Sequence, residues 1–300
     1  MIITPLQKNN LPEFCHTQGT EDIDEKSLLN LWDNEISKPG WCFILETDQG
    51  QKGRIGFLRA GENSLNMFGL HLPNSFEGAL ESPVRFLTEI FHLLQKEGIH
   101  QIHYHLESDA IDHLMTLEAL KKAGMQVTQT KKSLTLQEKD FNKLSDNRLE
   151  YKSLSEIGKP AFLQAMQIVT HETLDREDEK QYDNNRQNGA EEHFSFLQEI
   201  GDREDSWYLA YSRGVFVGLV IPQLFNKQTG AINYIGVDPK QRGKGYVVDL
   251  LDKGIASLFE RNAQYVIADI DELNFPMEKA LIKMGFVEAK KIRVLSISLV

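Results

Sequence analysis

Three stretches of the chain recur later in the same order, and this repetition limits the fold more than any other feature. The paired stretches are residues 66–71 with 233–238, residues 119–125 with 280–286, and Trp41 with Trp207. The members of each pair lie roughly 160–170 residues apart, a regularity that chance seldom produces. The repetition therefore predicts two tandem copies of one unit built from strands and helices.

The length and the local composition predict where one copy ends. A chain of 300 residues fits two ordinary domains better than one. The polar stretch at residues 138–147, which is rich in Lys, Asp and Asn, has the composition of a connection between domains. We therefore expect a first domain at residues 1–138, a linker at 139–148 and a second domain at 149–300.

The bulk composition is that of an ordinary globular protein, with 41% hydrophobic and 26% charged residues. No apolar run is long enough to cross a bilayer, and the N-terminus lacks a basic region and a cleavage site, so we expect no membrane partner. Cys15 and Cys42 form no recognisable disulfide framework, which is compatible with a reducing cytoplasm. The net charge of -11 argues against a nucleic-acid partner, because a phosphate backbone would be repelled.

The hydrophobic periodicity of the second copy predicts alternating strands and helices. We expect strands at residues 149–154, 207–211, 215–224, 231–237, 265–270 and 291–300, and helices at 159–171, at 190–200, from Tyr246 and after Asn274. The helix from Tyr246 carries an apolar stripe of Val247, Val248, Leu251, Ile255 and Leu258. Residues 172–189 are highly polar. This order of elements is typical of a layered α/β fold.

The turn between the strand at 231–237 and the helix from Tyr246 has the features of a phosphate-binding site. A helix N-terminus presents free backbone N–H groups and the positive end of the helix dipole, and both attract anions. The glycines of the turn let the backbone approach a phosphate without a Cβ in the way. Arg242 and Lys244 add positive charge around a second phosphate. The turn therefore predicts a pyrophosphate-bearing ligand.

The same turn resembles the acyl-CoA signature of the GNAT acetyltransferase superfamily, in which Arg-x-x-Gly-x-Gly/Ala follows a Val-x-Pro strand end. The matching residues are Val237, Pro239, Arg242 and Gly245. Val247 stands where the family usually has Gly or Ala, and its side chain would crowd the pyrophosphate. A second block also resembles the family, because Asn274 is followed by a short helix and by Gly285-Phe286. Leu281 takes the place of a Tyr that often protonates the departing thiolate in the family.

The resemblance implies an α/β fold of two tandem GNAT-like domains, each a mixed, mostly antiparallel sheet flanked by helices. It also implies acetyl-CoA as cosubstrate, held by Ile235, Gly236, Val237, Arg242, Gly243, Lys244, Gly245, Tyr246, Val247 and Asn274. In the family the strand ahead of the turn diverges from the next one and binds the pantetheine arm, and a backbone N–H there polarises the thioester carbonyl. The implied function is direct N-acetylation of a primary amine on a small molecule or peptide. A homodimer is compatible with this function.

The general base is harder to identify. The family often has a Glu on the strand before the turn, where this chain has Asn233 and Tyr234 instead. These two residues are placed to line the site, and Asp271 ends the facing strand, so the three are the catalytic candidates. The alternative for Asp271 is a bond to nearby backbone, which is common for strand-end Asp residues. Tyr234, Tyr246 or water could serve as the acid.

The first copy lacks these features. In place of the phosphate turn it carries Glu77 and Glu81, which would repel a pyrophosphate, and residues 106–110 contain no counterpart of Asn274. We interpret the first copy as a degenerate domain that has lost cofactor binding. Two alternatives to an enzyme remain open. The chain could bind acyl-CoA without turnover as a sensor or scaffold, which its departures from the family pattern favour, or its first copy could have become a partner-binding module.

Two further groups of residues suggest chemistry. The acidic segment at 171–179 lies where the family places its substrate-gripping helices, so it favours a cationic substrate, with a solvated surface as the alternative. His100, His103 and His105 are of a type that binds metals, but no Cys or third carboxylate is spaced to complete a site, and we expect no metal.

Overall fold

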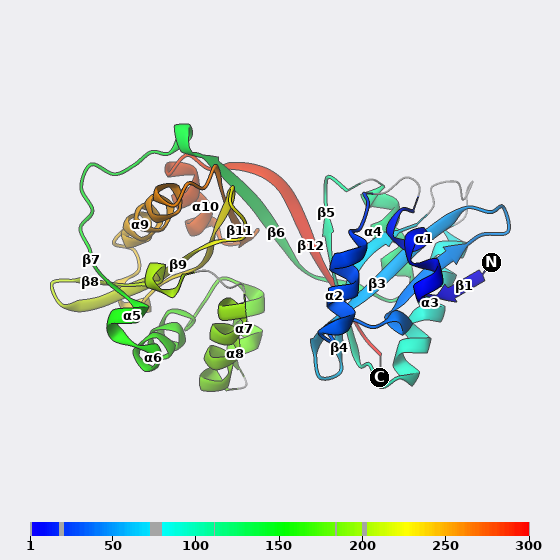
Figure 1. Cartoon of the computed structure of the whole chain (residues 1–300). Helices are drawn as coiled ribbons and strands as arrows, with labels where there is room; N and C mark the ends of the chain where they lie inside the picture. The colour runs from blue at the N-terminus through cyan, green and yellow to red at the C-terminus, as the bar shows by residue number, and fades with distance from the viewer. Residues whose placement is uncertain are drawn as a thin grey trace. The chain divides into compact units, whose positions relative to one another are not determined.

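The computed structural model describes residues 2–17, 21–72, 80–110, 112–183, 185–199 and 203–299, and the chain divides into two compact units (Figure 1). Unit 1 comprises residues 1–128 and 292–300, and unit 2 comprises residues 129–291. Two long strands, β6 (Gln126–Gln137) and β12 (Val287–Ser298), begin in one unit and end in the other. Each unit is an α/β domain, as the repetition in the sequence predicts.

The boundaries between the two compact units lie at other positions than those that the composition predicts. The sequence assigns a closing strand at 291–300 to the second domain, but residues 292–298 of β12 pair antiparallel with β5 (Gln101–Glu107) of unit 1. Hydrophobic alternation predicts a strand without predicting its partner, so it cannot show such an exchange. The limits at residues 138 and 149 therefore stay a prediction about the repeated sequence.

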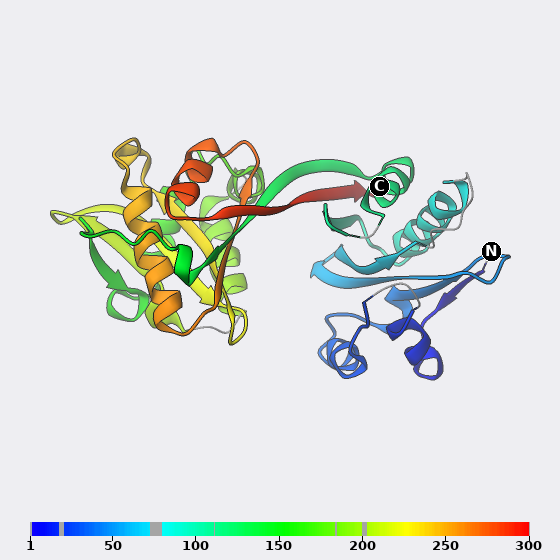
Figure 2. The same cartoon turned by 90° about the horizontal axis from the view of Figure 1, so that it is seen from above.

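Unit 1 is a mixed sheet between two layers of helices. Its strand order is β1-β2-β3-β4-β5-β12, with β1 (Ile2–Pro5), β2 (Cys42–Glu46), β3 (Lys52–Gly61) and β4 (Ser64–His71). Its helices are α1 (Leu11–Cys15), α2 (Glu25–Asp33), α3 (Glu81–Lys96) and α4 (His113–Lys122). One core lies under α3 and α4 and another under α1 and α2, on opposite sides of the sheet (Figure 2). The neighbouring strands are antiparallel, except that β4 and β5 run parallel.

Unit 2 has the same plan. Its strand order is β6-β11-β10-β9-β8-β7, with β7 (Glu150–Ser153), β8 (Tyr208–Ser212), β9 (Val215–Leu224), β10 (Thr229–Val237) and β11 (Tyr265–Asp271). Its helices are α5 (Leu154–Ile157), α6 (Lys159–Val169), α7 (Arg176–Asp183), α8 (Arg186–Glu199), α9 (Tyr246–Glu260) and α10 (Phe275–Lys283). Short 3-10 helices in the chain are at Lys8–Asn10, Pro39–Trp41, Glu138–Asp140, Glu204–Ser206 and Pro239–Gln241. The strands β10 and β11 are the parallel pair.

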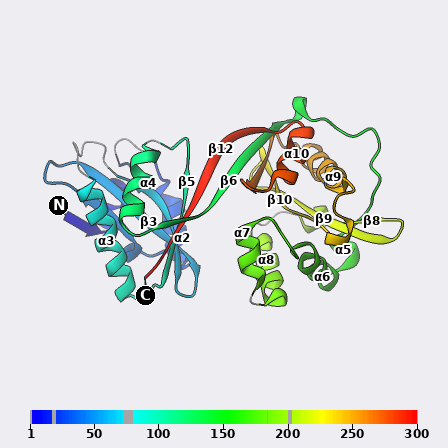
Figure 3. The same cartoon turned by 180° about the vertical axis from the view of Figure 1, so that it is seen from behind.

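Two apolar cores hold the helices of unit 2 against the two faces of its sheet. The predicted stripe of α9 is buried at Leu251, Ile255 and Leu258, in a core that also contains residues of α10. Residues of α6 and α8 share the other core with the fully buried Trp207. Figure 3 shows α9 and α10 on one side of the sheet and α6 and α8 on the other. The two cores explain why the strands between them, such as β9, are apolar at nearly every position.

The strand β10 leaves its neighbour β11 after the first third of its length. The two strands pair only from Thr229–Ala231 to Tyr265–Ile267. The pairing of β10 with β9 continues to Val237, with a bulge between Ile232 and Tyr234 that leaves Asn233 as the extra residue. A bulge bends its strand and increases the local twist. The second half of β10 therefore has one edge that no described strand pairs, as the family resemblance implies.

The remaining elements of unit 2 follow the predicted order with one addition. The polar segment at 172–189 contains α7, and α8 begins at Arg186, before the predicted start at residue 190. The mean hydropathy of such a segment is low, and α7 has only eight residues, so periodicity gave little signal there. The residues 74–79 of the first copy, on which the prediction of a degenerate turn rests, lie outside the described residues.

Candidate functional site

A pocket of about 360 Å³ opens at the end of β10, within the size range of small-molecule sites. Its lining residues are Val169, Glu172, Thr173, Leu174, Ile235, Gly236, Val237, Gln241, Arg242, Gly243, Gly245, Tyr246, Val247, Asn274, Pro276 and Met277. The structure thus brings together nine of the ten predicted cofactor-binding residues. Lys244 is the exception, because its Nζ is 2.7 Å from Gln241 Oε1 and it does not line the pocket.

The turn before α9 presents a row of unused backbone donors. Gly243 and Gly245 both have φ of 77°, in the left-handed region that glycine adopts without strain. The N–H groups of residues 243–247 donate to no acceptor among the described residues, and the first later bond runs from Val248 N to Gly245 O. Five consecutive free N–H groups at the positive end of a 15-residue helix can bind an anion.

Arg242, which the sequence predicts to add positive charge around a second phosphate, also bonds to the protein itself. Its guanidinium donates to the carbonyl oxygens of Val169 (3.1 Å), His171 (2.7 Å) and Glu172 (2.8 Å). Its Nε donates to Val237 O at 3.2 Å. These carbonyls lie at the end of α6 and just after it, where no N–H group of the helix can donate to them. Arg242 therefore ties the end of α6 to the end of β10. Four of its five N–H groups bond to the protein, while its charge lies at the pocket.

The backbone of Ile235, Gly236 and Val237 forms one wall of the pocket. These residues pair with β9 on one edge, while their other edge faces the gap left by β11. Gly236 has no room for a side chain, since a Cβ there would lie 2.6 Å from the Cβ of Val169 on α6. The close contact places α6 directly over β10 and leaves backbone as the binding surface.

The departures from the family pattern have clear positions. Val247 lines the pocket in the first turn of α9. Leu281 is 1% exposed, belongs to the core under α9 and α10, and is not one of the lining residues. Asn274 combines both of its predicted roles, because it lines the pocket and its Oδ1 accepts from Met277 N at 3.3 Å as the N-cap of α10.

Asn233 and Tyr234, two of the catalytic candidates, have partners inside the protein and do not line the pocket. The Asn233 side-chain amide donates to Gln223 Oε1 on β9. Tyr234 is 8% exposed, and its hydroxyl lies 2.7 Å from Thr170 Oγ1. Burial raises the pKa of Tyr234 well above its usual value, which keeps the hydroxyl protonated. A catalytic role for either residue stays a prediction.

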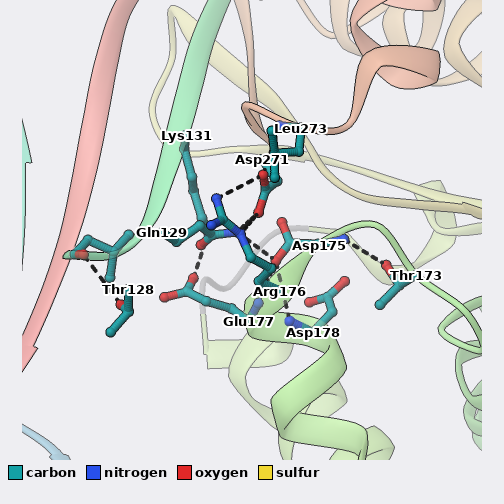
Figure 4. Close-up of polar contacts among 11 residues, drawn as sticks. Thr128, Gln129, Lys131, Thr173, Asp175, Arg176, Glu177, Asp178, Asp271 and Leu273 are labelled. Carbon is teal, nitrogen blue, oxygen red and sulfur yellow. Dashed lines mark hydrogen bonds and ion pairs between the residues drawn. The ribbon is translucent and has the colours of Figure 1, made fainter. Parts of the chain in front are cut away.

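Asp271, the third candidate, anchors the start of α7 (Figure 4). Its carboxylate accepts from Arg176 Nε (2.7 Å), Arg176 Nη2 (3.1 Å) and Gln129 Nε2 (2.9 Å). Burial acts to raise the pKa of Asp271, but these bonds outweigh it and the pKa is lowered. A carboxylate held in its charged form by an arginine is a weak base. The contacts favour a structural role, which was the alternative in the sequence.

Sequence reasoning missed the loop after α6 and the start of α10 as parts of the pocket. Thr173, Leu174, Pro276 and Met277 line it, and none of them is a residue type that signals chemistry. Among the described residues there is no group of three or more His, Cys, Asp or Glu that could hold a metal ion. No helix in the described ranges is long and apolar enough to span a membrane.

Comparisons with known proteins agree with this geometry. The model of the Acetyltransferase (GNAT) family matches residues 167–286. A GCN5-related N-acetyltransferase from Sphaerobacter thermophilus is 14% identical, with a TM-score of 0.69 over 99% of this chain and 95% of that chain. A tandem GNAT protein from the clavulanic acid biosynthesis pathway, solved without AcCoA, is 12% identical, with a TM-score of 0.58 over 100% of this chain and 98% of that chain.

A GNAT-family acetyltransferase from Colwellia psychrerythraea is 11% identical, with a TM-score of 0.53 over 99% of both chains. At such identities the likeness shows the fold, and its extent confirms the predicted pair of tandem GNAT-like domains. No curated protein sequence matches the chain.

Proposed function

The chain carries a GNAT acetyltransferase domain at residues 167–286, and from this premise we propose that it transfers an acetyl group from acetyl-CoA to a primary amine. The acceptor is a small molecule or a peptide. The observation that carries the proposal is the row of five free N–H groups at residues 243–247, which lies at the mouth of the pocket beside β10. A pyrophosphate offers oxygen acceptors for such a row.

The residues of the pocket divide the work of binding. The N–H groups of the turn receive the pyrophosphate, and the free edge of β10 at Ile235–Val237 pairs with the amide groups of the pantetheine arm. A backbone N–H of that edge then stabilises the charge that develops on the thioester oxygen. Pro276 and Met277 of α10 and Leu174 after α6 supply apolar walls that exclude water. Arg242 holds the wall at the end of α6 in place.

The first experiment is a calorimetric titration with acetyl-CoA, run on the wild type, on Gly245→Glu and on Gly214→Glu. We expect one site per chain, and a loss of affinity of about 100-fold or more in Gly245→Glu, because a carboxylate would face the pyrophosphate. Gly214 is the matched control, since its φ of +75° resembles the +77° of Gly245, it has open space around it, and it lies in the β8–β9 turn. Equal affinity in the two variants would overturn the assignment of the turn.

A second candidate function is a sensor or scaffold that binds acyl-CoA without turnover. The burial of Leu281 in the core favours it, since no hydroxyl stands at the family's acid position. The two candidates differ in whether free thiol is released when an amine is added to the protein and acetyl-CoA. Binding without release across a broad amine panel would favour the sensor.

The proposal also covers where the protein works and with what. We place it in the cytoplasm, where its two free, buried cysteines would stay reduced. The net charge of -11 is unfavourable for a nucleic-acid partner and favourable for a cationic acceptor. A homodimer remains compatible with the fold.

A further inference from the structure

The start of α7 lies against the end of β11, and a short hydrogen-bond network fixes it there (Figure 4). Arg176 binds Asp271 at the end of β11. Gln129 of β6 donates through Nε2 to both Asp271 (2.9 Å) and Asp175 (3.1 Å). Asp175 Oδ1 in turn accepts from the N–H groups of Glu177 and Asp178. The first turn of α7 is thereby held by residues from β6 and β11.

One carboxylate in this region has no partner. The side chain of Asp178 accepts no hydrogen bond and forms no ion pair with any described residue, and Figure 4 draws it without a dashed line. Lys131, the nearest cation, instead contacts Glu177 at 2.7 Å. Gln129 is 1% exposed, and its Oε1 also lacks a partner among the described residues. A half-buried carboxylate and a buried amide oxygen without donors leave room for a donor from outside the protein.

Aromatic residues from three elements pack together near Asp178. Tyr234 on β10 lies beside His193 on α8, with 4.5 Å between their ring centroids. The Tyr182 hydroxyl on α7 is 3.3 Å from His193 Nδ1. The charge of Asp178 is close enough to both tyrosines to raise their pKa further. Aromatic rings around a carboxylate form a site for a cation, because both attract positive charge.

Residues of this group are linked to the lining of the acyl-CoA pocket by short chain segments. Tyr234 directly precedes Ile235, which lines the pocket, and Thr173 lines the pocket while its hydroxyl accepts from Asp175 N at 3.2 Å. Thr170, bonded to Tyr234, directly follows Val169 of the pocket wall. Tyr234 belongs to the core under α6 and α8, whereas Ile235 packs against the core under α9 and α10, so an amine held beside Asp178 would approach β10 from the α6 and α8 side.

We propose that Asp178, Tyr234 and His193 form the acceptor site, and that Asp178 is the general base for a primary ammonium group. This inference rests on the proposed function. The Asp178 carboxylate takes one proton from the ammonium nitrogen, forming an O–H bond as the N–H bond breaks. The lone pair released forms the C–N bond to the acyl carbon, the C–S bond breaks, and a second proton leaves the nitrogen with the sulfur as the thiol.

The charges around Asp178 suit the role of a general base. Burial, followed by the nearby charge of Asp175, raises the pKa of Asp178 to about 7, with Lys131 opposing and Glu177 adding to the shift. Burial lowers the pKa of His193 to about 4, so its ring is neutral near pH 7. The tyrosines have raised pKa values and do not titrate in this range. Asp178 is thus the group among these that changes charge near neutral pH.

The sign of the pH dependence follows from the raised pKa. Asp178 is protonated below about pH 7 and accepts a proton only above it, so the rate should rise as the pH passes through about 7. Because its folded-state pKa lies above the usual value of about 3.9 for Asp, ionisation opposes folding. The free energy of unfolding should therefore fall as the pH rises from about 4 to about 7, compared with a variant that lacks the carboxyl group.

The test compares the wild type with Asp178→Asn and with Glu179→Gln, which removes the same charge from an exposed neighbour. The probes are n-hexylamine, benzylamine and 1,5-diaminopentane, and thiol release from acetyl-CoA is followed from pH 5.5 to pH 9, a range of roughly two units around the expected pKa. We expect Asp178→Asn to lower kcat by about 10²–10⁴-fold, to lose the rise near pH 7, and to bind acetyl-CoA as the wild type does. Glu179→Gln should keep the wild-type profile.

Each other outcome identifies what has failed. An Asp178→Asn variant with the wild-type kcat and pH profile would overturn the base, as would a pH dependence of unfolding equal to that of the wild type. Binding of acetyl-CoA by the wild type, with neither binding nor acetylation of any probe amine, would overturn the acceptor site and leave the cofactor site intact. Loss of acetyl-CoA binding in the wild type itself would overturn the proposed function before any amine is added.

Discussion

The two units use an arginine for the same task but take it from different places. In unit 1, Arg54 on β3 is 3% exposed and donates to the carbonyls of Phe14 and Cys15 at the end of α1, and to Gly69 on β4. In unit 2, the exposed Arg242 donates to the carbonyls at the end of α6 and to Val237 on β10. Both arginines tie a helix end to the strand that diverges from its parallel neighbour.

The strand geometry of the units is otherwise alike. The parallel strands pair at three residues in each unit, Ser64–Asn66 with Gln101–His103 and Thr229–Ala231 with Tyr265–Ile267. The difference therefore lies in where the charge is. Unit 1 has a guanidinium buried beside its diverging strand, where burial and the Arg54 charge lower the pKa of His71. In unit 2 the corresponding arginine, Arg242, lies in the turn, and the space beside β10 stays open as a pocket.

The largest effect is expected from replacing Arg54, the buried arginine of unit 1. Arg54→Met keeps much of the side-chain volume but leaves the carbonyls of Phe14, Cys15, Glu21 and Gly69 without their donor. An unsatisfied buried carbonyl costs about 1–3 kcal/mol, so we expect a loss of about 3 kcal/mol or more in the free energy of unfolding. Denaturant unfolding followed by circular dichroism measures this loss.

The control for this variant lies on the same strand. Arg59 of β3 is exposed, so Arg59→Met should change the free energy of unfolding by less than about 0.5 kcal/mol. Acetyl-CoA binding should stay unchanged in both variants, because unit 2 holds the pocket. Equal and small losses of unfolding free energy in the two variants would show that Arg54 does not hold the end of α1 in place, and would remove the basis of the comparison.

The next effect sharpens the comparison at one repeated position. Gly69 and Gly236 correspond in the repeat, but Gly69 has φ of +59° whereas Gly236 lies against Val169 of α6. Gly236→Ala should cost about 2 kcal/mol through overpacking, since its Cβ would meet the helix at 2.6 Å. Gly69→Ala should cost about 1 kcal/mol through backbone strain, and Gly69→Asn less, because Asn tolerates left-handed φ.

Unfolding curves of these three variants and of Gly236→Asn decide between the two causes. Asn is larger than Ala, so Gly236→Asn should be worse than Gly236→Ala, whereas at Gly69 the order is reversed. The same order at both positions would mean that the two glycines serve one purpose and that the units differ less than the contacts indicate.

Much of the fold could be predicted because it rests on local patterns. The strands at 207–211 and 215–224 and the helix from Tyr246 follow from periodicity and turn residues, and the structure confirms them. The pairing of β12 with β5 could not be predicted, since a strand with one apolar face fits any sheet edge of the right register. The repeat indicated two units but not the exchange of strands that defines their limits.

The proposed site could be predicted where backbone N–H groups form it, and it could not be predicted where side chains form it. Gly243 and Gly245 identify the turn because their conformation is demanded by local geometry. Asp178 gave no such signal, because it lies among Glu177, Glu179 and other charges that read as one solvated surface. It differs from them in having a pKa raised by burial, which is a tertiary property. Asp271 was singled out for its strand-end position and has a structural partner instead.

The smallest effect on stability is expected from replacing Arg242, the corresponding arginine of unit 2. Arg242→Ala removes four hydrogen bonds at an exposed site, so we expect a loss of only about 1 kcal/mol in the free energy of unfolding. Its effect on acetyl-CoA affinity should be larger than its effect on stability suggests, about 10-fold, since the freed end of α6 forms a wall of the pocket. Lys244→Ala removes the same charge from the same turn without touching α6, so its loss of affinity should be smaller. If both variants lost affinity equally, charge alone would explain the turn, and the two arginines would not be counterparts.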